Sequence, residues 1–100
     1  MPPLFNAIND KDKKVVVSAI LTVSSLGVRA KEAIPFLIKR FKDPDATIRY
    51  YAIDAISKFG PAATLAVPAL TEALKDQDAI VRNAAKSSLK SIAQADQADD

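Results

Sequence analysis

The sequence contains no cysteine and no histidine among its 100 residues. Without cysteine there is no disulfide bond, thiolate zinc site or cysteine nucleophile, and the chain needs no oxidising compartment. Catalysis would therefore rest on carboxylates, but these fall mostly at predicted turns, as in Asp43 with Asp45 and Asp76 with Asp78. Because aspartates at turns cap helices, we expect no enzymatic activity.

Glycine is nearly absent, since only Gly27 and Gly60 occur. This scarcity excludes a glycine-rich loop that cradles phosphate groups. The acidic pair Asp10 and Asp12 lacks the further oxygen ligands of a calcium loop. The sequence therefore predicts neither a cofactor nor a metal site.

Long apolar runs are missing as well. No stretch approaches the roughly 18 uninterrupted apolar residues of a membrane span. The first residues lack the basic segment and apolar run of a signal peptide. From these observations we expect a soluble cytoplasmic protein that does not enter a membrane.

The chain does contain an internal repeat with a period of 33 residues and no gap. Alanine is frequent among the 49% hydrophobic residues, and it favours helices and their close packing. A period of this length predicts an all-α array in which each unit buries its apolar face against its neighbours. The positions that superpose are Pro2, Pro35 and Pro68; Leu4, Leu37 and Leu70; Asp10, Asp43 and Asp76; Asp12, Asp45 and Asp78; and Ala19, Ala52 and Ala85.

Each unit divides into two predicted helices. In the middle unit, apolar residues recur at helical spacing from Ile48 to Phe59, Asp45 can cap the start, and Gly60 follows the end. The same pattern along the chain predicts five helices and one truncated helix, at 4–9, 13–26, 30–42, 46–59, 62–75 and 79–94.

The second helix of a unit contains a proline, Pro35 or Pro68. Because proline has no amide hydrogen and clashes with the preceding turn, this helix either begins near Val67 or is bent there. Since the prolines recur in register, the sequence favours a bend that both units share.

The domain limits follow from the same pattern. We expect one repeat domain over residues 1–93, made of a partial unit 1–12, the units 13–45 and 46–78, and a partial unit 79–93. Residues 94–100 are small or polar, include three acids and carry no apolar anchor, so a flexible acidic tail is predicted there.

Aspartate, a hydrophobic residue followed by arginine, and proline recur in the segments 33–37, 41–45, 48–49, 60–63, 66–70, 74–78 and 80–85. In these features the chain resembles the HEAT-like repeats, in particular the short bacterial and cyanobacterial type of phycobilin lyase subunits. The resemblance implies a right-handed α-solenoid of stacked antiparallel helix pairs. It also implies that the second helices line a concave face.

An aspartate is followed six residues later by an arginine in two units, as Asp43 with Arg49 and Asp76 with Arg82. In the proteins that the chain resembles, such pairs form a structural ladder of charge-assisted hydrogen bonds between neighbouring turns. The first unit has Val16 at the arginine position. Val16 either has no upstream neighbour to bridge or belongs to an apolar patch for a partner or a preceding unit.

The two ends of the predicted array differ in polarity. Stable arrays close with polar capping units, but residues 2–8 are mostly apolar. In the last helix, Lys86 stands at the position of Ile20 and Ile53. We infer that the array either was part of a longer one at its N-terminal side or associates there with itself or another protein.

The candidate partner site lies on the second helices, at positions off their apolar stripe: Phe36, Lys39, Arg40, Ala69, Glu72 and Ala73. Phe36 replaces the proline or alanine of the other units, and an aromatic ring beside cations is typical of interface hot spots. The alternative for Phe36 is packing under the helix connection. Tyr50 on the first helix is a secondary candidate, and of Tyr50 and Tyr51 we expect one to pack and one to be exposed.

Charge is divided unevenly, with +5 on residues 1–42 and −3 on residues 43–100. We interpret the chain as a non-catalytic module or scaffold that binds a peptide or protein. One alternative is nucleic-acid binding through the basic half, which the acidic half disfavours. A further alternative, which only the resemblance suggests, is an accessory module of a phycobilin lyase-like protein.

Overall fold

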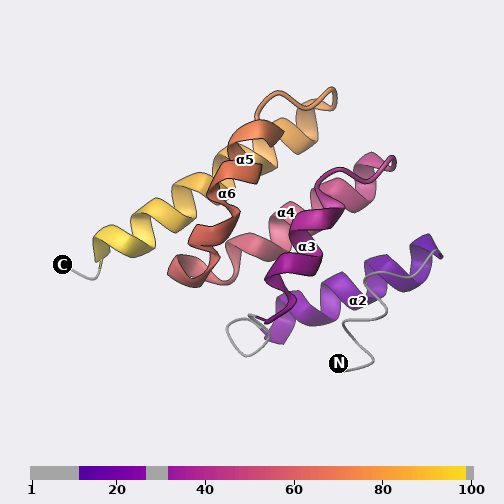
Figure 1. The fold of residues 1–100 in the computed structure, drawn as a ribbon, viewed down its shortest axis with the longest axis horizontal. Helices are drawn as coiled ribbons and strands as arrows, with labels where there is room; N and C mark the ends of the chain where they lie inside the picture. Colours follow the sequence, from indigo (N-terminus) through magenta and orange to yellow (C-terminus); the bar gives the residue numbers. More distant parts are fainter. Residues whose placement is uncertain (1–11, 27–31, 99–100) are drawn as a thin grey trace.

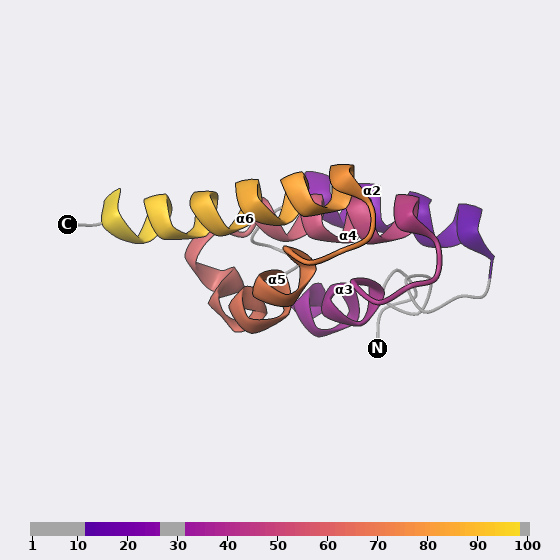
Figure 2. The same cartoon turned by 90° about the horizontal axis from the view of Figure 1, so that it is seen from above.

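In the computed structural model, which describes residues 12–26 and 32–98, the helices form two layers (Figures 1 and 2). One layer contains α2 (Lys13–Leu26), α4 (Ala46–Ser57) and α6 (Ala79–Ala98). The other contains α3 (Ile34–Arg40) and α5 (Val67–Ala73), and the 3-10 helix η2 (Gly60–Ala66) leads into α5. No strand occurs in these residues, and the prediction of an all-α solenoid is confirmed.

Aspartates at equivalent positions begin the three helices of the first layer. Asp12, Asp45 and Asp78 each accept a hydrogen bond from the amide two residues further on, at 2.9, 2.8 and 2.8 Å. These amides have no partner within the helix, so the carboxylate satisfies a donor that would otherwise lack one. The period of the aspartates thus determines where each long helix starts.

The prolines determine where the second helices start. Pro35 and Pro68 lie in the first turns of α3 and α5, where the missing amide removes no helical hydrogen bond. A 3-10 turn precedes α3, and η2 precedes α5. Of the two alternatives for the second helix, a start near Val67 is correct and a bend within a longer helix is wrong. The α-helices are consequently shorter than the predicted segments.

The last helix is longer than predicted. It continues to Ala98, beyond the expected end at residue 94, because alanine and glutamine support a helix and no glycine or proline interrupts it. Part of the predicted flexible tail is therefore helical. The predicted truncated helix at 4–9 and the final residues 99–100 lie outside the described residues.

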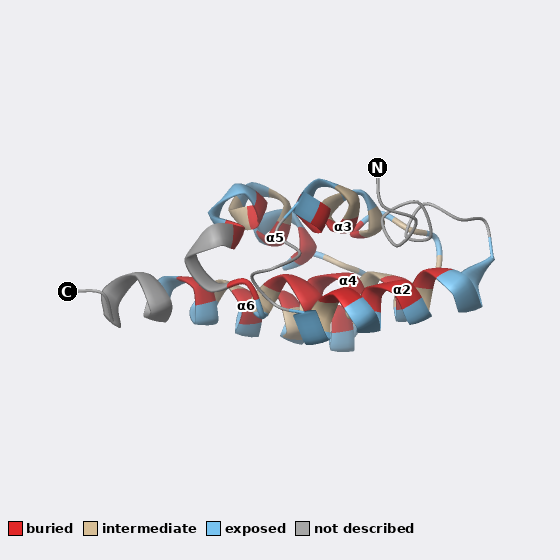
Figure 3. Cartoon of the chain, turned by 90° about the horizontal axis from the view of Figure 1, so that it is seen from below, coloured by how far each residue is buried: buried red, intermediate tan, exposed pale blue. Residues whose placement is uncertain are grey.

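The core lies between the two layers, as Figure 3 shows. The central helix α4 contacts α2, α3 and α6, and alanines at one repeated position, Ala19, Ala52 and Ala85, are buried between the long helices. Small side chains there allow the helices to approach closely. The largest fully buried apolar side chains are Val16, Ile20, Val23, Leu37, Ile48, Ile53, Ile56, Phe59, Leu70 and Val81.

Val16 belongs to this core and is 1% exposed. Val16 itself is therefore not part of an apolar surface that is open to a partner. Its neighbours on α2 differ, since Val15 is exposed and Val17 is half-buried. Successive residues of a helix point about 100° apart, so only one of the three valines faces the core fully.

One hydroxyl group is buried in the core. Ser88 on α6 donates a hydrogen bond of 2.9 Å to the carbonyl oxygen of Ile53 on α4. A buried hydroxyl without a partner costs about 1–3 kcal/mol, so this bond allows a polar side chain at the helix contact. The equivalent positions hold Ala55 and Thr22, and the Thr22 hydroxyl donates to Ser18 in its own helix.

Candidate functional site

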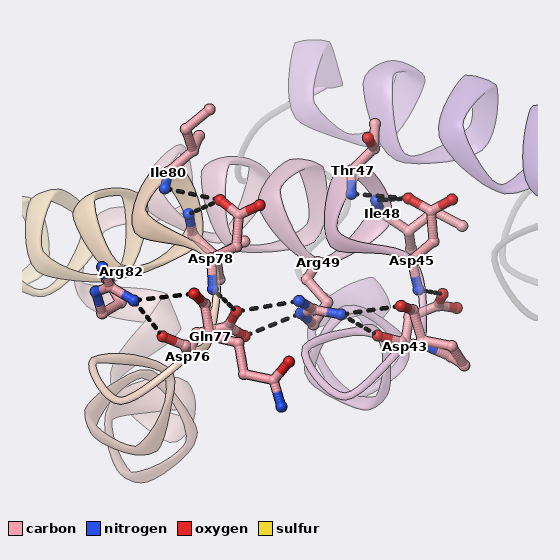
Figure 4. A network of polar contacts seen from close by, with 12 residues as sticks. Asp43, Asp45, Thr47, Ile48, Arg49, Asp76, Gln77, Asp78, Ile80 and Arg82 are labelled. Atoms are coloured by element: carbon pink, nitrogen blue, oxygen red, sulfur yellow. Dashed lines mark hydrogen bonds and ion pairs between the residues drawn. The ribbon is translucent and has the colours of Figure 1, made fainter.

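Arg49 on α4 joins two successive turns of the array (Figure 4). Its Nε and Nη2 donate to the two carboxylate oxygens of Asp76, before α6, at 2.9 and 3.0 Å. Its Nη1 donates to the carbonyl oxygens of Asp43 and Pro44, before α4, at 2.8 and 3.2 Å. Arginine thus meets the carboxylate of the following unit and the backbone of its own. Paired bonds of this kind are among the strongest hydrogen bonds.

Asp76 is held in its ionised form. Burial raises the pKa of Asp76, but hydrogen bonds from Arg49 and from the Asp78 amide outweigh burial, and the pKa lies below its usual value. The side chains of Arg49 and Asp76 are only 15% and 12% exposed. Asp76 is therefore part of a fixed ion pair and does not exchange protons near neutral pH.

Arg82 repeats half of this arrangement. Its Nη1 donates to the carbonyl oxygens of Asp76 and Gln77 at 2.7 and 3.1 Å, as Arg49 does one unit earlier. No carboxylate within residues 12–26 and 32–98 forms an ion pair with Arg82. In this part of the chain, Arg49 is the ladder arginine that bonds both to the carboxylate of the following unit and to carbonyl groups of its own unit.

Asp43 takes its cation from its own unit. Nη1 of Arg40 lies 2.9 Å from Oδ2 of Asp43, and the side chains are 19% and 8% exposed. The residue one repeat before Arg49 is Val16, so that position offers Asp43 no arginine. The residue one repeat after Arg40 is Ala73, so this arginine does not recur in the next unit. Arg40 thus neutralises a carboxylate that would otherwise be buried without a cation. Arg40 therefore pairs within the chain, and its role in binding a partner stays a prediction.

A groove of about 850 Å³ lies between α3 and α5. Both apolar and charged side chains line it. Lys42 and Lys75, which are both exposed, occupy the same position in successive units. The lining residues are Ile38, Phe41, Lys42, Asp43, Pro44, Arg49, Pro68, Ala69, Glu72, Ala73, Lys75, Asp76 and Gln77.

The groove includes half of the predicted second-helix residues. Those of α5 line it, namely Ala69, Glu72 and Ala73, whereas those of α3, namely Phe36, Lys39 and Arg40, do not. On this side of the groove the lining comes from Ile38, on another side of α3, and from Phe41, directly after the end of α3. Each second helix has two sides, so equivalent positions on α3 and α5 do not face the same groove. Ala73 is 7% exposed and offers little surface to a ligand.

Phe36 and Lys39 form a pair of their own on α3. Nζ of Lys39 lies 6.0 Å from the centroid of the Phe36 ring, within the range of a cation–π interaction. The ring is half-buried and packs against the core. Phe36 thus lies partly in the core and beside a cation, and its role in binding a partner stays a prediction.

Comparison with known families agrees with this geometry, because the family model described as HEAT repeats matches residues 1–90. The chain belongs to the HEAT repeat family. HEAT repeats generally act as scaffolds for protein interactions and are typically non-catalytic. The match does not extend to phycobilin lyase subunits in particular. No curated protein matches this HEAT repeat chain.

The long-helix layer of this HEAT repeat protein contains a smaller hollow of about 240 Å³ between α4 and α6. Tyr50 and Tyr51 line the hollow, with ring centroids 5.3 Å apart in an edge-to-face arrangement. Both rings are half-buried. The expectation that one would pack and the other be exposed is wrong, because both rings pack against the core beside the contact between α4 and α6.

In the described part of the chain, no group of three or more histidine, cysteine, aspartate or glutamate residues could hold a metal ion. None of the described helices combines the length and the apolar content needed to cross a membrane.

The sequence prediction did not include the groove residues Ile38 and Lys75 in the candidate site. A signal for the lysines was present, because Lys42 and Lys75 recur at one position of the repeat. Recurrent exposed cations beside a turn mark a surface that successive units share. The prediction instead followed the aromatic residue that broke the repeat, Phe36.

Proposed function

We propose that this HEAT repeat protein is a non-catalytic module that binds an extended peptide segment of a partner protein in the groove between α3 and α5. The observation that carries the proposal is the groove itself, whose lining combines apolar side chains with two exposed lysines one repeat apart. In ligand sites, apolar surface contributes contact area and polar groups fix the orientation of the ligand.

The charges of the groove favour a peptide with acidic side chains. Asp43 and Asp76 line the groove, but Arg40 and Arg49 neutralise them. The exposed charges are then two lysines and Glu72. Carboxylates of the peptide would pair with Lys42 and Lys75, and apolar side chains would contact Ile38, Pro68 and Ala69.

The same pairing argues against catalysis in the groove. A general acid or base must exchange a proton with substrate, which requires a carboxylate with a pKa near the working pH. Asp76 instead has a lowered pKa and a bidentate arginine. The groove is thus suited to binding without a reaction.

Selection of peptides from a displayed random library on the immobilised protein tests the proposal. We expect enriched sequences with acidic residues spaced among apolar ones, and loss of their binding in the double variant Lys42→Glu, Lys75→Glu. The matched control is Lys86→Glu, which removes an exposed lysine on α6, outside the groove. Peptides that bind the double variant as well as the wild type would contradict the assignment of the groove.

Nucleic-acid binding is the alternative to peptide binding, and an oligonucleotide titration of the wild type distinguishes the two. A phosphate backbone held by lysines binds with a steep dependence on salt concentration. If labelled single- and double-stranded oligonucleotides bind the wild type, with such a dependence, and no peptide is enriched, the partner is nucleic acid and the proposal of a peptide site is wrong.

A further inference from the structure

The long-helix layer provides an internal comparison at the starts of α4 and α6. Asp45 and Asp78 are equivalent, and each caps its helix through Oδ1 (Figure 4). Oδ2 of Asp45 also pairs with Nζ of Lys13, on the preceding long helix α2, at 3.1 Å. The carboxylate of a capping aspartate therefore accommodates an ammonium group in this fold.

The equivalent place beside Asp78 lacks its lysine. In the repeat register, Ala46 stands where Lys13 stands one unit earlier. Ala46 and Asp78 both line the hollow of about 240 Å³ between α4 and α6. No cation in the described part of the chain pairs with Asp78. The hollow thus lies beside Asp78 at the position that corresponds to Lys13 beside Asp45, where the lysine side chain is 68% exposed.

We propose that this hollow is a docking site for a lysine side chain of a partner protein, whose ammonium group pairs with Asp78 as Lys13 pairs with Asp45. The occupant is defined by charge complementarity and by the internal precedent. The site lies in the long-helix layer, separate from the groove between α3 and α5, and does not depend on the peptide function proposed for that groove.

The walls of the hollow suit the other parts of a lysine side chain. Tyr50 and Tyr51 line it, and an ammonium group near an aromatic face gains a cation–π interaction. Ile80 also lines it and is 64% exposed, which leaves apolar surface for the methylene groups. The first unit has Val17 and Ser18 in place of the tyrosines, so the aromatic walls occur where the lysine is missing.

NMR titration of the isotope-labelled protein with N-acetyl-lysine-N-methylamide tests the proposal. We expect saturable shifts of the amides of Thr47, Tyr50, Tyr51 and Ile80. The uncharged analogue N-acetyl-norleucine-N-methylamide has the same apolar stem and should cause much smaller shifts. Equal shifts with both compounds, or no shifts at these amides, would overturn the proposal.

Two variants and a control make the test specific. Asp78→Asn keeps a good capping residue but removes the charge, and it should weaken binding of the lysine probe about five-fold, as expected for a partly exposed ion pair. Ala46→Lys should place a lysine of the chain itself in the hollow and abolish binding. Asp54→Asn on α4, outside the hollow, should change nothing. Undiminished binding to Asp78→Asn or to Ala46→Lys would place the lysine elsewhere.

Failure of this proposal and failure of the peptide groove are distinguishable. The lysine probe reports on amides of α4 and α6, whereas acidic peptides would shift amides of α3 and α5. The double variant Lys42→Glu, Lys75→Glu should bind the lysine probe as the wild type does, since neither lysine lines the hollow. Loss of probe binding in that variant would contradict the assignment to the hollow.

Discussion

Arg40 pairs with Asp43, only three residues further along the chain, whereas the equivalent aspartate of the next unit, Asp76, pairs with Arg49, which is 27 residues away. Both aspartates precede a long helix, and each carboxylate accepts a hydrogen bond from the backbone amide two residues further along the chain. The repeat therefore keeps the aspartate and its need for a cation, while the source of the cation changes from the adjacent unit to the same unit.

A double-mutant cycle measures this replacement. Arg40→Ala should lower the free energy of unfolding by about 1–3 kcal/mol, because the largely buried Asp43 loses its cation. Asp43→Asn in the same background should add less than it does alone, with a coupling of about 1 kcal/mol. Urea unfolding of the four proteins gives the values. Strictly additive losses would show that the two side chains do not interact in solution.

The two ladder arginines should differ in their contribution to stability. Arg49→Ala should cost about 2–3 kcal/mol, because it breaks a bidentate pair and leaves Asp76 buried without a cation. Arg82→Ala is the matched control, since Arg82 is exposed and contacts only carbonyl oxygens. Its loss should cost less than about 1 kcal/mol. Similar melting temperatures of the two variants would contradict the special role of Arg49.

Stability should fall in acid partly through Asp76. The pKa of Asp76 in the folded protein lies below its usual value of 3.8, so the unfolded chain binds the proton more readily. The stabilisation is therefore complete above about pH 4 and is lost as the pH falls through the folded pKa. Asp76→Asn should be less stable at neutral pH and should lose less stability on acidification. Parallel curves for the two proteins, from chemical unfolding at pH 2–7, would exclude this contribution.

The two-layer packing predicts which apolar truncations matter. Leu70 and Ile56 are both fully buried, so Leu70→Ala or Ile56→Ala should cost about 2–5 kcal/mol. Leu65 in η2 is 68% exposed and serves as the control, with an expected change within about 0.5 kcal/mol. Differential scanning calorimetry gives the comparison. A large effect of Leu65→Ala would indicate that η2 packs differently in solution.

The repeat period and the residues that mark helix ends were sufficient to predict most of the helical architecture. Helix 13–26 agrees with α2, and the capping aspartates place the starts of α4 and α6 correctly. The second helices were predicted too long, because apolar spacing alone does not separate a 3-10 segment from an α-helix. The prolines indicate where the second α-helices begin, since proline is compatible with the first turn of a helix and not with its interior.

The candidate site was harder to predict because each second helix has a neighbour on either side. Phe36 and Ala69 are equivalent in sequence, but only Ala69 lines the groove between α3 and α5. Likewise, Arg40 pairs with Asp43 in the unit where Val16, on another helix, stands in place of the ladder arginine. A repeat predicts equivalent positions, whereas contacts depend on which neighbour is present.

The buried hydroxyl of Ser88 has a consequence for how the copies of the repeat can be ordered. Its hydrogen bond requires the carbonyl group of Ile53 on the adjoining helix. If the last unit were moved to another place in the array by recombination, that hydroxyl would face a different neighbour and would need a new acceptor. The copies are therefore similar in period but not interchangeable, and each has diverged to fit its own place in the chain.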